Sequence, residues 1–238
     1  MFPVSTRRRL AQPITDAIRA RIPSARGKLL RPLVRFQEMR FPTFDDAVHE
    51  SIAISDDYFR YTTLGLAVQR VLDEEIPGAL AEVGVWRGET SSLLHRLAPT
   101  RRLYLFDTFA GFPERDLPPG HQDLRFRDTS LESVRRRVGP SPNVLLRPGY
   151  VPEVLQDVAG ERFAFVLLDL DLFEPTRASL EFFYPRLAPG AYLIVHDYNN
   201  DESDWACKRA LDGFLADKPE RLTELGDVWG SALIRRAG

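Results

Sequence analysis

Residues 81–90 constrain the fold of this chain more than any other stretch. An apolar run that contains one acid, Glu82, leads into Gly84 and Gly88 and then into a segment with helical periodicity. This order is typical of a β-strand, a tight turn and a helix start, the unit that binds nucleoside-containing cofactors at the carboxyl end of a parallel sheet. Glycine has no Cβ, so the backbone can approach a ligand closely there. Taken alone, the stretch fits cofactor binding and simple strand–helix packing equally well.

Two later apolar runs end in polar residues. Residues 163–168 are followed by Asp169 and Asp171, and residues 191–195 are followed by His196 and Asp197. Parallel strands would bring these side chains to the edge that carries the glycine turn. Acids gathered at one edge are unfavourable unless a positive charge or a proton lies among them, and a divalent metal would supply that charge. We therefore expect Asp169, His196 and Asp197 to form a metal or catalytic site.

The roles of the individual polar residues differ. Asp171 is expected to cap the helix that begins near residue 174. His196 is a candidate metal ligand, general base or supporting residue. Glu82 is a buried acid between apolar neighbours, which favours a contact with a cofactor amine or a backbone N–H group. Asp107 ends a predicted strand 23 positions after Gly84, where nucleoside-binding folds carry the acid that accepts hydrogen bonds from ribose; a turn-forming aspartate is the alternative.

Strands and helices alternate along the rest of the chain. Predicted strands at 79–84, 102–106, 143–147, 163–168 and 190–195 are separated by helices at 89–98, 130–138, 151–158 and 174–187. Two further helices, 44–55 and 58–75, precede the first strand. A helix at 203–216 and a hairpin formed by 222–225 and 228–234 end the chain. This order predicts an α/β fold with a mostly parallel sheet and an antiparallel edge. The long polar segment 110–128, which contains His121, is a candidate lid.

Charge is divided unevenly along the chain. Residues 1–40 hold ten basic and two acidic residues, whereas the whole chain of 238 residues has a net charge of −2. We expect residues 1–43 to form a basic helical N-terminal arm and residues 44–238 to form one domain. The arm is expected to dock on an acidic surface of its own body or of a partner subunit, and its apolar and basic pieces favour a dimer contact and hence a homodimer. The near-neutral total charge and the sparse aromatic residues among the basic residues of the arm argue against binding to nucleic acid.

Cysteine content and hydropathy indicate the cellular compartment of the protein. Cys207 is the single cysteine, so an internal disulfide is excluded and a reducing cytoplasm is favoured. No apolar segment long enough for a signal peptide or a membrane span follows the N-terminal arginines. A cytoplasmic protein without a membrane partner is expected.

Several motifs together resemble the macrocin O-methyltransferase (TylF-like) family of S-adenosylmethionine-dependent sugar O-methyltransferases. Its patterns Glu-x-Gly-Val-Trp-Arg-Gly, Asp-Ser/Thr-Phe-x-Gly-x-Pro, Asp-x-Asp-x-Tyr-Glu-Ser-Thr and Asp-Asp-Tyr are matched by residues 82–88, 107–113, 169–176 and 196–198. A Cys-Arg-x-Ala-Val-like stretch is matched by residues 207–211. The resemblance covers about residues 60 to 215 in order, and it does not cover the arm before residue 44.

The resemblance implies a class I methyltransferase, with a Rossmann-like, seven-stranded and mostly parallel sheet. It implies an enzyme that methylates a hydroxyl of a sugar in a glycosylated natural product or a polysaccharide. The implied contacts with S-adenosylmethionine are Thr62 or Thr63, Glu82, Gly84, Gly88, Asp107, Thr108 and Ser130. The resemblance also implies a magnesium ion on Asp169 and the Asp-Asp pair, with Asp169 as a general base.

One departure from the family pattern concerns the metal. His196 replaces the first Asp of the pair, and imidazole suits zinc, nickel or iron better than magnesium. Three interpretations remain open: an altered metal preference, a weaker magnesium site with His196 as the base, or methylation without metal. A retained divalent ion on Asp169, His196 and Asp197 is the expectation.

Three rival functions can be stated. A nicotinamide-dependent oxidoreductase is disfavoured because Gly84 and Gly88 lack the three-glycine fingerprint for a pyrophosphate. A methyltransferase acting on a catechol-like phenol is the second alternative. The third is a degenerate member that binds the cofactor without catalysis, since one acid is missing at the metal position.

Overall fold

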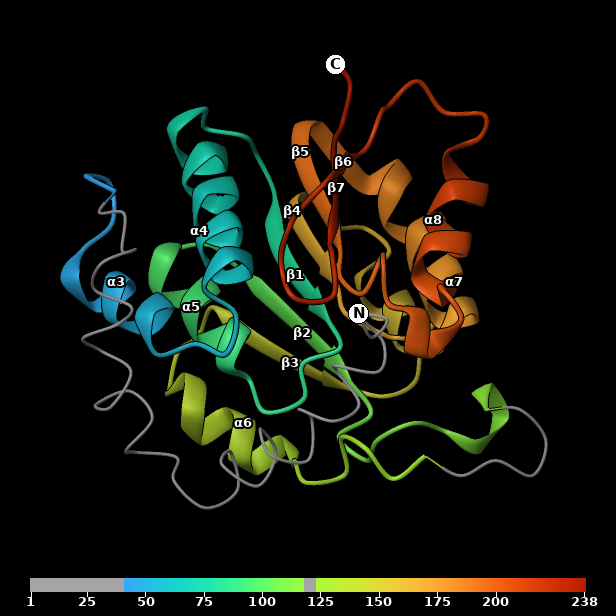
Figure 1. The fold of residues 1–238 in the computed structure, drawn as a ribbon. Coiled ribbons are helices and arrows are strands. Elements are labelled where there is room, and N and C mark those ends of the chain that lie inside the picture. Colours follow the sequence, from blue (N-terminus) through green and yellow to red (C-terminus); the bar gives the residue numbers. More distant parts are fainter. Residues whose placement is uncertain (1–40, 118–122) are drawn as a thin grey trace, which may run out of the picture. The chain divides into compact units, whose positions relative to one another are not determined.

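The computed structural model describes residues 41–117 and 123–238, and it divides the chain into two compact units, Met1–Asp56 and Asp57–Gly238 (Figure 1). In the first unit, helix α3 spans Asp46–Ala53; Asp45 caps it by accepting from the Val48 amide at 2.7 Å. The predicted basic arm lies almost wholly outside the described residues, and so does His121. The predicted domain boundary at residue 44 stays a prediction.

In the described part of the second unit, seven strands form one sheet in the order β3-β2-β1-β4-β5-β7-β6. Strands β1 to β5 run parallel, whereas β7 runs antiparallel to both β5 and β6. The strands are β1 (Ala79–Val83), β2 (Leu103–Asp107), β3 (Val144–Pro148), β4 (Phe163–Leu168), β5 (Leu187–Val195), β6 (Thr223–Glu224) and β7 (Ala232–Arg235). The predicted α/β fold with a mostly parallel sheet and an antiparallel edge is confirmed.

Helices cover both faces of this sheet. Figure 1 shows α4, α5 and α6 grouped on one side and α7 and α8 on the other. Their bounds are α4 (Tyr58–Asp73), α5 (Glu89–Leu97), α6 (Leu131–Val138), α7 (Phe173–Phe183) and α8 (Ala206–Leu215). Because both faces are covered, the central strands read as continuous apolar runs, and every residue of β1 and β4 is buried.

Two predicted elements differ from the structure. Residues 151–158 were expected to form an α-helix, but the chain forms a 3-10 helix, η2, over Glu153–Val158. The last strand begins at Ala232 and not at residue 228, because Asp227 holds the preceding loop: its carboxylate accepts from the amide and the hydroxyl of Ser231, both at 2.6 Å. The long segment 110–128 contains a short 3-10 helix, η1 (Glu114–Asp116).

None of the described helices is long and apolar enough to cross a membrane.

Candidate functional site

The glycine turn after β1 lies against the end of β4. Gly84 has a φ of +90°, and a Cβ on it would lie 1.8 Å from the carbonyl oxygen of Asp169. The Asp169 amide donates to the Val83 carbonyl at 2.8 Å, and the His196 amide donates to Leu168 at 2.8 Å. The carboxyl ends of β1, β4 and β5 therefore meet at one edge, as the sequence predicts.

Glu82 is enclosed beneath this edge. Its side chain is 1% exposed, and one carboxylate oxygen accepts from the hydroxyl of Ser91, in α5, at 2.5 Å. Burial raises the pKa of Glu82 to about 8, although the Ser91 hydrogen bond acts in the opposite direction. A cation such as an ammonium group, bound next to this buried carboxyl, would stabilise its ionised form.

Asp107, at the end of β2, is bound to the glycine turn. Oδ2 accepts from the amides of Val85 and Trp86 at 2.7 and 2.8 Å, and Oδ1 accepts from the Phe109 amide at 2.7 Å. The turn-forming role that the sequence offered as an alternative is thus present. A carboxylate has about four lone-pair sites, so Asp107 retains capacity to accept from ribose.

The other predicted cofactor contacts lie around this turn. Ser130 caps α6 through a capping box with Ser133, and Thr108 accepts from the Ala110 amide and donates to the Gly111 carbonyl. Thr63 donates to the Phe59 carbonyl, whereas the buried hydroxyl of Thr62 has no partner among the described residues. Thr62 is therefore the threonine of this pair with a free hydroxyl.

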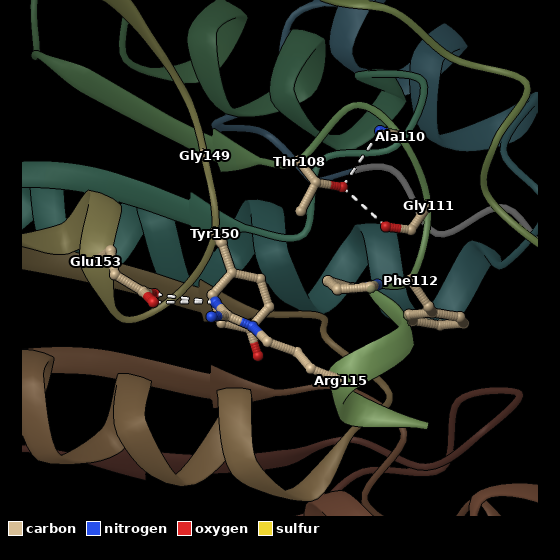
Figure 2. Close-up of a pocket in the computed structure, with 9 residues that line it drawn as sticks. Thr108, Ala110, Gly111, Phe112, Arg115, Gly149, Tyr150 and Glu153 are labelled. Carbon is tan, nitrogen blue, oxygen red and sulfur yellow. Dashed lines mark hydrogen bonds and ion pairs between the residues drawn. The ribbon is translucent and has the colours of Figure 1, made fainter. Parts of the chain in front are cut away.

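A pocket of about 560 Å³ opens where β2 and β3 end (Figure 2). The Arg115 guanidinium lies 3.1 Å from the centre of the Tyr150 ring and pairs with Glu153. The pocket is lined by Thr108, Ala110, Gly111, Phe112, Pro113, Arg115, Gly149, Tyr150 and Glu153. Neither Glu82 nor Asp169 lines it, so it is a separate hollow on the side of Asp107.

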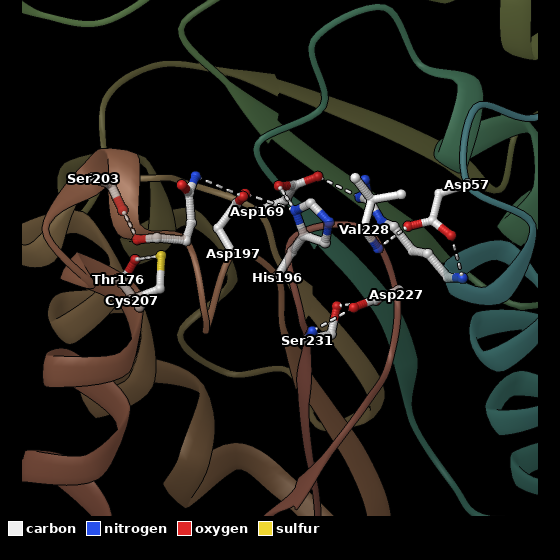
Figure 3. Close-up of polar contacts among 12 residues, drawn as sticks. Asp57, Asp169, Thr176, His196, Asp197, Ser203, Cys207, Asp227, Val228 and Ser231 are labelled. Carbon is white, nitrogen blue, oxygen red and sulfur yellow. Dashed lines mark hydrogen bonds and ion pairs between the residues drawn. The ribbon is translucent and has the colours of Figure 1, made fainter. Parts of the chain in front are cut away.

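Polar side chains converge beyond the ends of β4 and β5 (Figure 3). Nδ1 of His196 lies 3.0 Å from Oδ1 of Asp169 and 2.7 Å from Oδ2 of Asp197. The second oxygen of Asp197 accepts from the Asn200 side chain at 3.0 Å. His196 and Asp197 are 5% and 4% exposed. The three residues predicted as a site are thus brought into contact.

Arg60 completes the cluster, and sequence reasoning did not find it. It lies in the first turn of α4, and its Nη2 forms an ion pair with Oδ2 of Asp169. Asp57 caps the same helix by accepting from the Arg60 amide at 3.1 Å, and its other oxygen accepts from the Val228 amide at 2.7 Å. A basic residue three positions after a capping aspartate was the available signal, but it gives no hint of a partner 109 positions away.

The charges in the cluster shift each other's pKa. Burial and the Arg60 charge both lower the pKa of His196, but Asp169 and Asp197 outweigh them and raise it to about 10. Burial raises the pKa of Asp169, and Arg60 and His196 outweigh this effect and hold it well below its usual range. At neutral pH, His196 is therefore an imidazolium and Asp169 a carboxylate.

The role expected for Asp171 is wrong. The N-cap position of α7 is Leu172, which makes no side-chain capping bond, and Asp171 adopts a φ of +60°. Asp171 is only 9% exposed; burial first, and then the neighbouring Asp197 and Asp169, raise its pKa well above the usual value. The aspartate belongs to the cluster and not to the helix start.

The spacing of the cluster admits a metal ion, but its donors suit magnesium poorly. Asp169, His196 and Asp197 each offer one atom, and these atoms lie within 4.8 Å of one another. Magnesium requires near-ideal octahedral geometry with oxygen ligands, whereas one donor here is an imidazole. Arg60 already places a positive charge on Asp169. The donor set does not fit the magnesium ion that the resemblance implies.

Comparison with known proteins identifies the family. The family described as Macrocin-O-methyltransferase (TylF) matches residues 57–224. An 8-demethyl-8-(2,3-dimethoxy-alpha-L-rhamnosyl)-tetracenomycin-C 4'-O-methyltransferase of Streptomyces olivaceus is 33% identical over 192 residues, covering 71% of this chain and 72% of the relative. The demethyldecarbamoylnovobiocin O-methyltransferase of Streptomyces niveus is 28% identical over 174 residues, or 66% and 65% of the two chains.

A solved structure agrees with this assignment. The O-methyltransferase NovP is 27% identical, with a TM-score of 0.65 over 76% of this chain and 81% of NovP. The fold is thus that of a solved O-methyltransferase. The chain belongs to the macrocin-O-methyltransferase (TylF) family and is an S-adenosylmethionine-dependent O-methyltransferase.

Proposed function

We propose that this enzyme methylates a hydroxyl of a sugar in a glycosylated natural product or a polysaccharide. The observation that carries the proposal is the polar edge beside the glycine turn, in a chain 33% identical to a relative named as a 4'-O-methyltransferase of a rhamnosyl tetracenomycin. A polyhydroxylated acceptor needs several hydrogen-bonding groups, and the edge offers carboxylates, an imidazole and a guanidinium.

The cofactor is proposed to lie along the turn. Its methionine end would contact Glu82, Gly84, Gly88 and the free hydroxyl of Thr62, with Thr63 nearby. Its ribose would be bound by Asp107, with Thr108 and Ser130 supporting the loops around it. Glu82 is buried, and within residues 41–117 and 123–238 no basic side chain is hydrogen-bonded to it. This supports the first contact, since an ammonium group would stabilise its ionised form.

The reaction joins the acceptor oxygen to the sulfonium methyl group. The oxygen attacks the methyl carbon in line with the C–S bond, that bond breaks, and S-adenosylhomocysteine leaves with the electron pair. The hydroxyl proton is proposed to pass to Asp169, because the Asp169 side chain is ionised whereas His196 is already protonated at neutral pH. A protonated ether is a strong acid, so a weakly basic carboxylate suffices as the acceptor. His196 orients the carboxylate through its Nδ1–H group.

A panel assay tests this function. The enzyme would be incubated with S-adenosylmethionine and glycosylated polyketides, nucleotide-linked deoxysugars, polysaccharide fragments or catechols, and S-adenosylhomocysteine release would be measured. Turnover of a sugar acceptor, lost in Asp169→Asn, supports the proposal. Turnover of catechols alone would indicate that the acceptor is a phenol and not a sugar. Cofactor binding without turnover of any acceptor would favour a degenerate member of the family.

Two further expectations stay predictions. The homodimer and the cytoplasmic location are inferred from the basic arm and from the single cysteine, which is buried in α8. We do not propose the divalent metal expected on Asp169, His196 and Asp197, because the donors of this cluster suit magnesium poorly.

A further inference from the structure

Both oxygens of Asp169 are engaged by groups of the protein itself. Oδ2 is paired with the Arg60 guanidinium, and Oδ1 lies 3.0 Å from Nδ1 of His196. The side chains of Arg60 and Asp169 are 13% and 22% exposed, so this ion pair is largely shielded from water. A shielded carboxylate with two such partners has no uncompensated charge for a metal to neutralise.

His196 presents a hydrogen and not a lone pair to the two aspartates. Its Nδ1 faces a carboxylate oxygen of Asp169 and, at 2.7 Å, one of Asp197. A lone pair aimed at two carboxylates would be repelled by both, so the contact requires an N–H group. With this hydrogen in place, Nδ1 is a donor and offers no lone pair to a metal.

The remaining oxygen of Asp197 is also occupied. It accepts from the Asn200 side chain at 3.0 Å, and both residues are buried. The four oxygens of Asp169 and Asp197 thus have Arg60, His196 twice, and Asn200 as partners. Groups of the chain itself thus contact each of these four oxygens, and the buried Asp171 lies beside Asp197.

We propose that this methyltransferase works without a divalent metal, and that Arg60 and His196 together occupy the place of the ion. The inference deepens the proposed function and rests on it. The ion pair with Asp169 holds the guanidinium, and Asp57 holds the backbone of Arg60, since it accepts from the Arg60 amide and, with its other oxygen, from the Val228 amide. Nε of Arg60 is buried and has no partner among the described residues, which leaves one donor for an oxygen of the acceptor or the cofactor.

Metal binding by the full-length protein tests the inference directly. Chelator-treated enzyme would be titrated with Mn²⁺, with free Mn²⁺ followed by electron paramagnetic resonance, and with Mg²⁺ in a calorimeter. We expect the wild type to leave the Mn²⁺ signal and the Mg²⁺ heats at their protein-free values, with and without S-adenosylhomocysteine. Stoichiometric binding of either ion that Asp169→Asn abolishes would overturn the inference.

A variant with aspartate at position 196, as in the family pattern, is expected to gain metal binding. In R60Q/H196D the guanidinium is removed and a third carboxylate replaces the imidazole, so Mn²⁺ binding is expected to become measurable, with an affinity on the order of tenfold to a hundredfold above the detection limit that the wild type does not reach. H196D alone, which keeps Arg60, should bind more weakly than the double variant, and it serves as the test if circular dichroism shows the double variant unfolded. Equal Mn²⁺ affinity in wild type and H196D would contradict the role of His196.

The matched control removes an arginine that pairs with carboxylates elsewhere. Arg177, on the surface of α7, pairs with Glu174 and Glu181. Arg177→Gln should leave the Mn²⁺ signal as in the wild type, and a gain of Mn²⁺ binding in this variant would show that the effect of R60Q/H196D is not specific to the cluster.

Failure of the inference is distinguishable from failure of the proposed function. S-adenosylhomocysteine binding, measured in the same calorimeter with and without chelator, reports on the cofactor site alone. Intact cofactor binding together with tight Mn²⁺ binding would overturn the metal-free inference only. Absent cofactor binding in both conditions would overturn the proposed function.

Discussion

Glu82, near the end of β1, affects both the stability of the fold and the proposed binding of the cofactor. The carboxyl is fully enclosed and bonded to the Ser91 hydroxyl, so the neutral form is favoured and the pKa is raised to about 8. A glutamate with a raised pKa stabilises the fold least when it is ionised; its contribution is full below about pH 4.5 and is lost as pH rises through about 8. A bound ammonium group reverses this preference.

Cofactor binding should therefore release a proton from Glu82. We expect the affinity for S-adenosylhomocysteine, which keeps the ammonium group, to rise as pH increases from about 6 to about 8, because the ionised form binds. Calorimetry in buffers of different ionisation enthalpy measures the released proton. In Glu82→Gln the proton release should vanish; an unchanged release in this variant would assign it to another group.

Gly84 and Gly88 differ in what surrounds them, so alanine should affect them unequally. At Gly84 a Cβ would lie 1.8 Å from the Asp169 carbonyl oxygen, a backbone atom that cannot turn aside. At Gly88 the nearest atom is Cγ1 of Val134 at 3.0 Å, and the φ of +76° adds about 1 kcal/mol of strain. We expect Gly84→Ala to destabilise the protein by about 3 kcal/mol or more and Gly88→Ala clearly less, as measured by urea unfolding. Equal losses would contradict the close approach of β1 and β4.

At the scale of elements, the start of α4 is tied to the loop before β7. Asp57 accepts from the Phe59 and Arg60 amides with one oxygen and from the Val228 amide with the other. One carboxylate thus caps a helix at the beginning of the second unit and holds a loop near its end. The same contact fixes the helical turn that carries Arg60.

Removal of this carboxylate should cost more than an ordinary cap. We expect Asp57→Ala to lower the free energy of unfolding by about 2–3 kcal/mol, since a cap contributes about 1 kcal/mol and a hydrogen bond to a charged group adds about 1.5 kcal/mol. Ser130→Ala, which removes the exposed cap of α6, is the control, with an expected loss of about 1 kcal/mol. Similar losses in the two variants would mean that the Val228 contact contributes nothing.

The sequence predicts elements well where one pattern dominates. The apolar runs of β1, β4 and the second half of β5 follow from burial on both faces, and the ends of β4 and β5 predict the meeting of Asp169, His196 and Asp197. The sequence does not predict the role of Arg60, because its partner, Asp169, is 109 positions away and only the packing of α4 brings the two side chains together. The sequence does not predict the place of Asp171 in the cluster, because its positive φ turns the backbone just after β4. The alternation of side chains between the two faces of a strand does not describe such a turn.

At the scale of the whole molecule, the boundary of the second unit and the family match coincide. Both begin at residue 57, whereas the basic segment predicted as an arm lies before residue 44. The cofactor and acceptor residues proposed above all belong to the second unit. The arm is thus a candidate for association and not for chemistry.

Deletion of residues 1–43 separates these roles. We expect the shortened protein to bind S-adenosylhomocysteine with the affinity of the full chain, because Glu82 and Asp107 are unaffected. If the arm forms the predicted homodimer, light scattering should show a dimer for the full chain and a monomer for the shortened one. A loss of cofactor binding on deletion would instead place the arm in the site.

The sheet order has a consequence for how the protein is made. Strand β7 follows all the other described strands in the sequence, yet it lies between β5 and β6 and pairs with both. Until β7 has been synthesised, β5 has an open edge and β6 has no neighbour in the sheet. The other elements of the sheet must therefore remain partly assembled during synthesis until β7 is available to pair. A truncation that removes β7 would leave the edge of β5 exposed, and such a product is expected to aggregate.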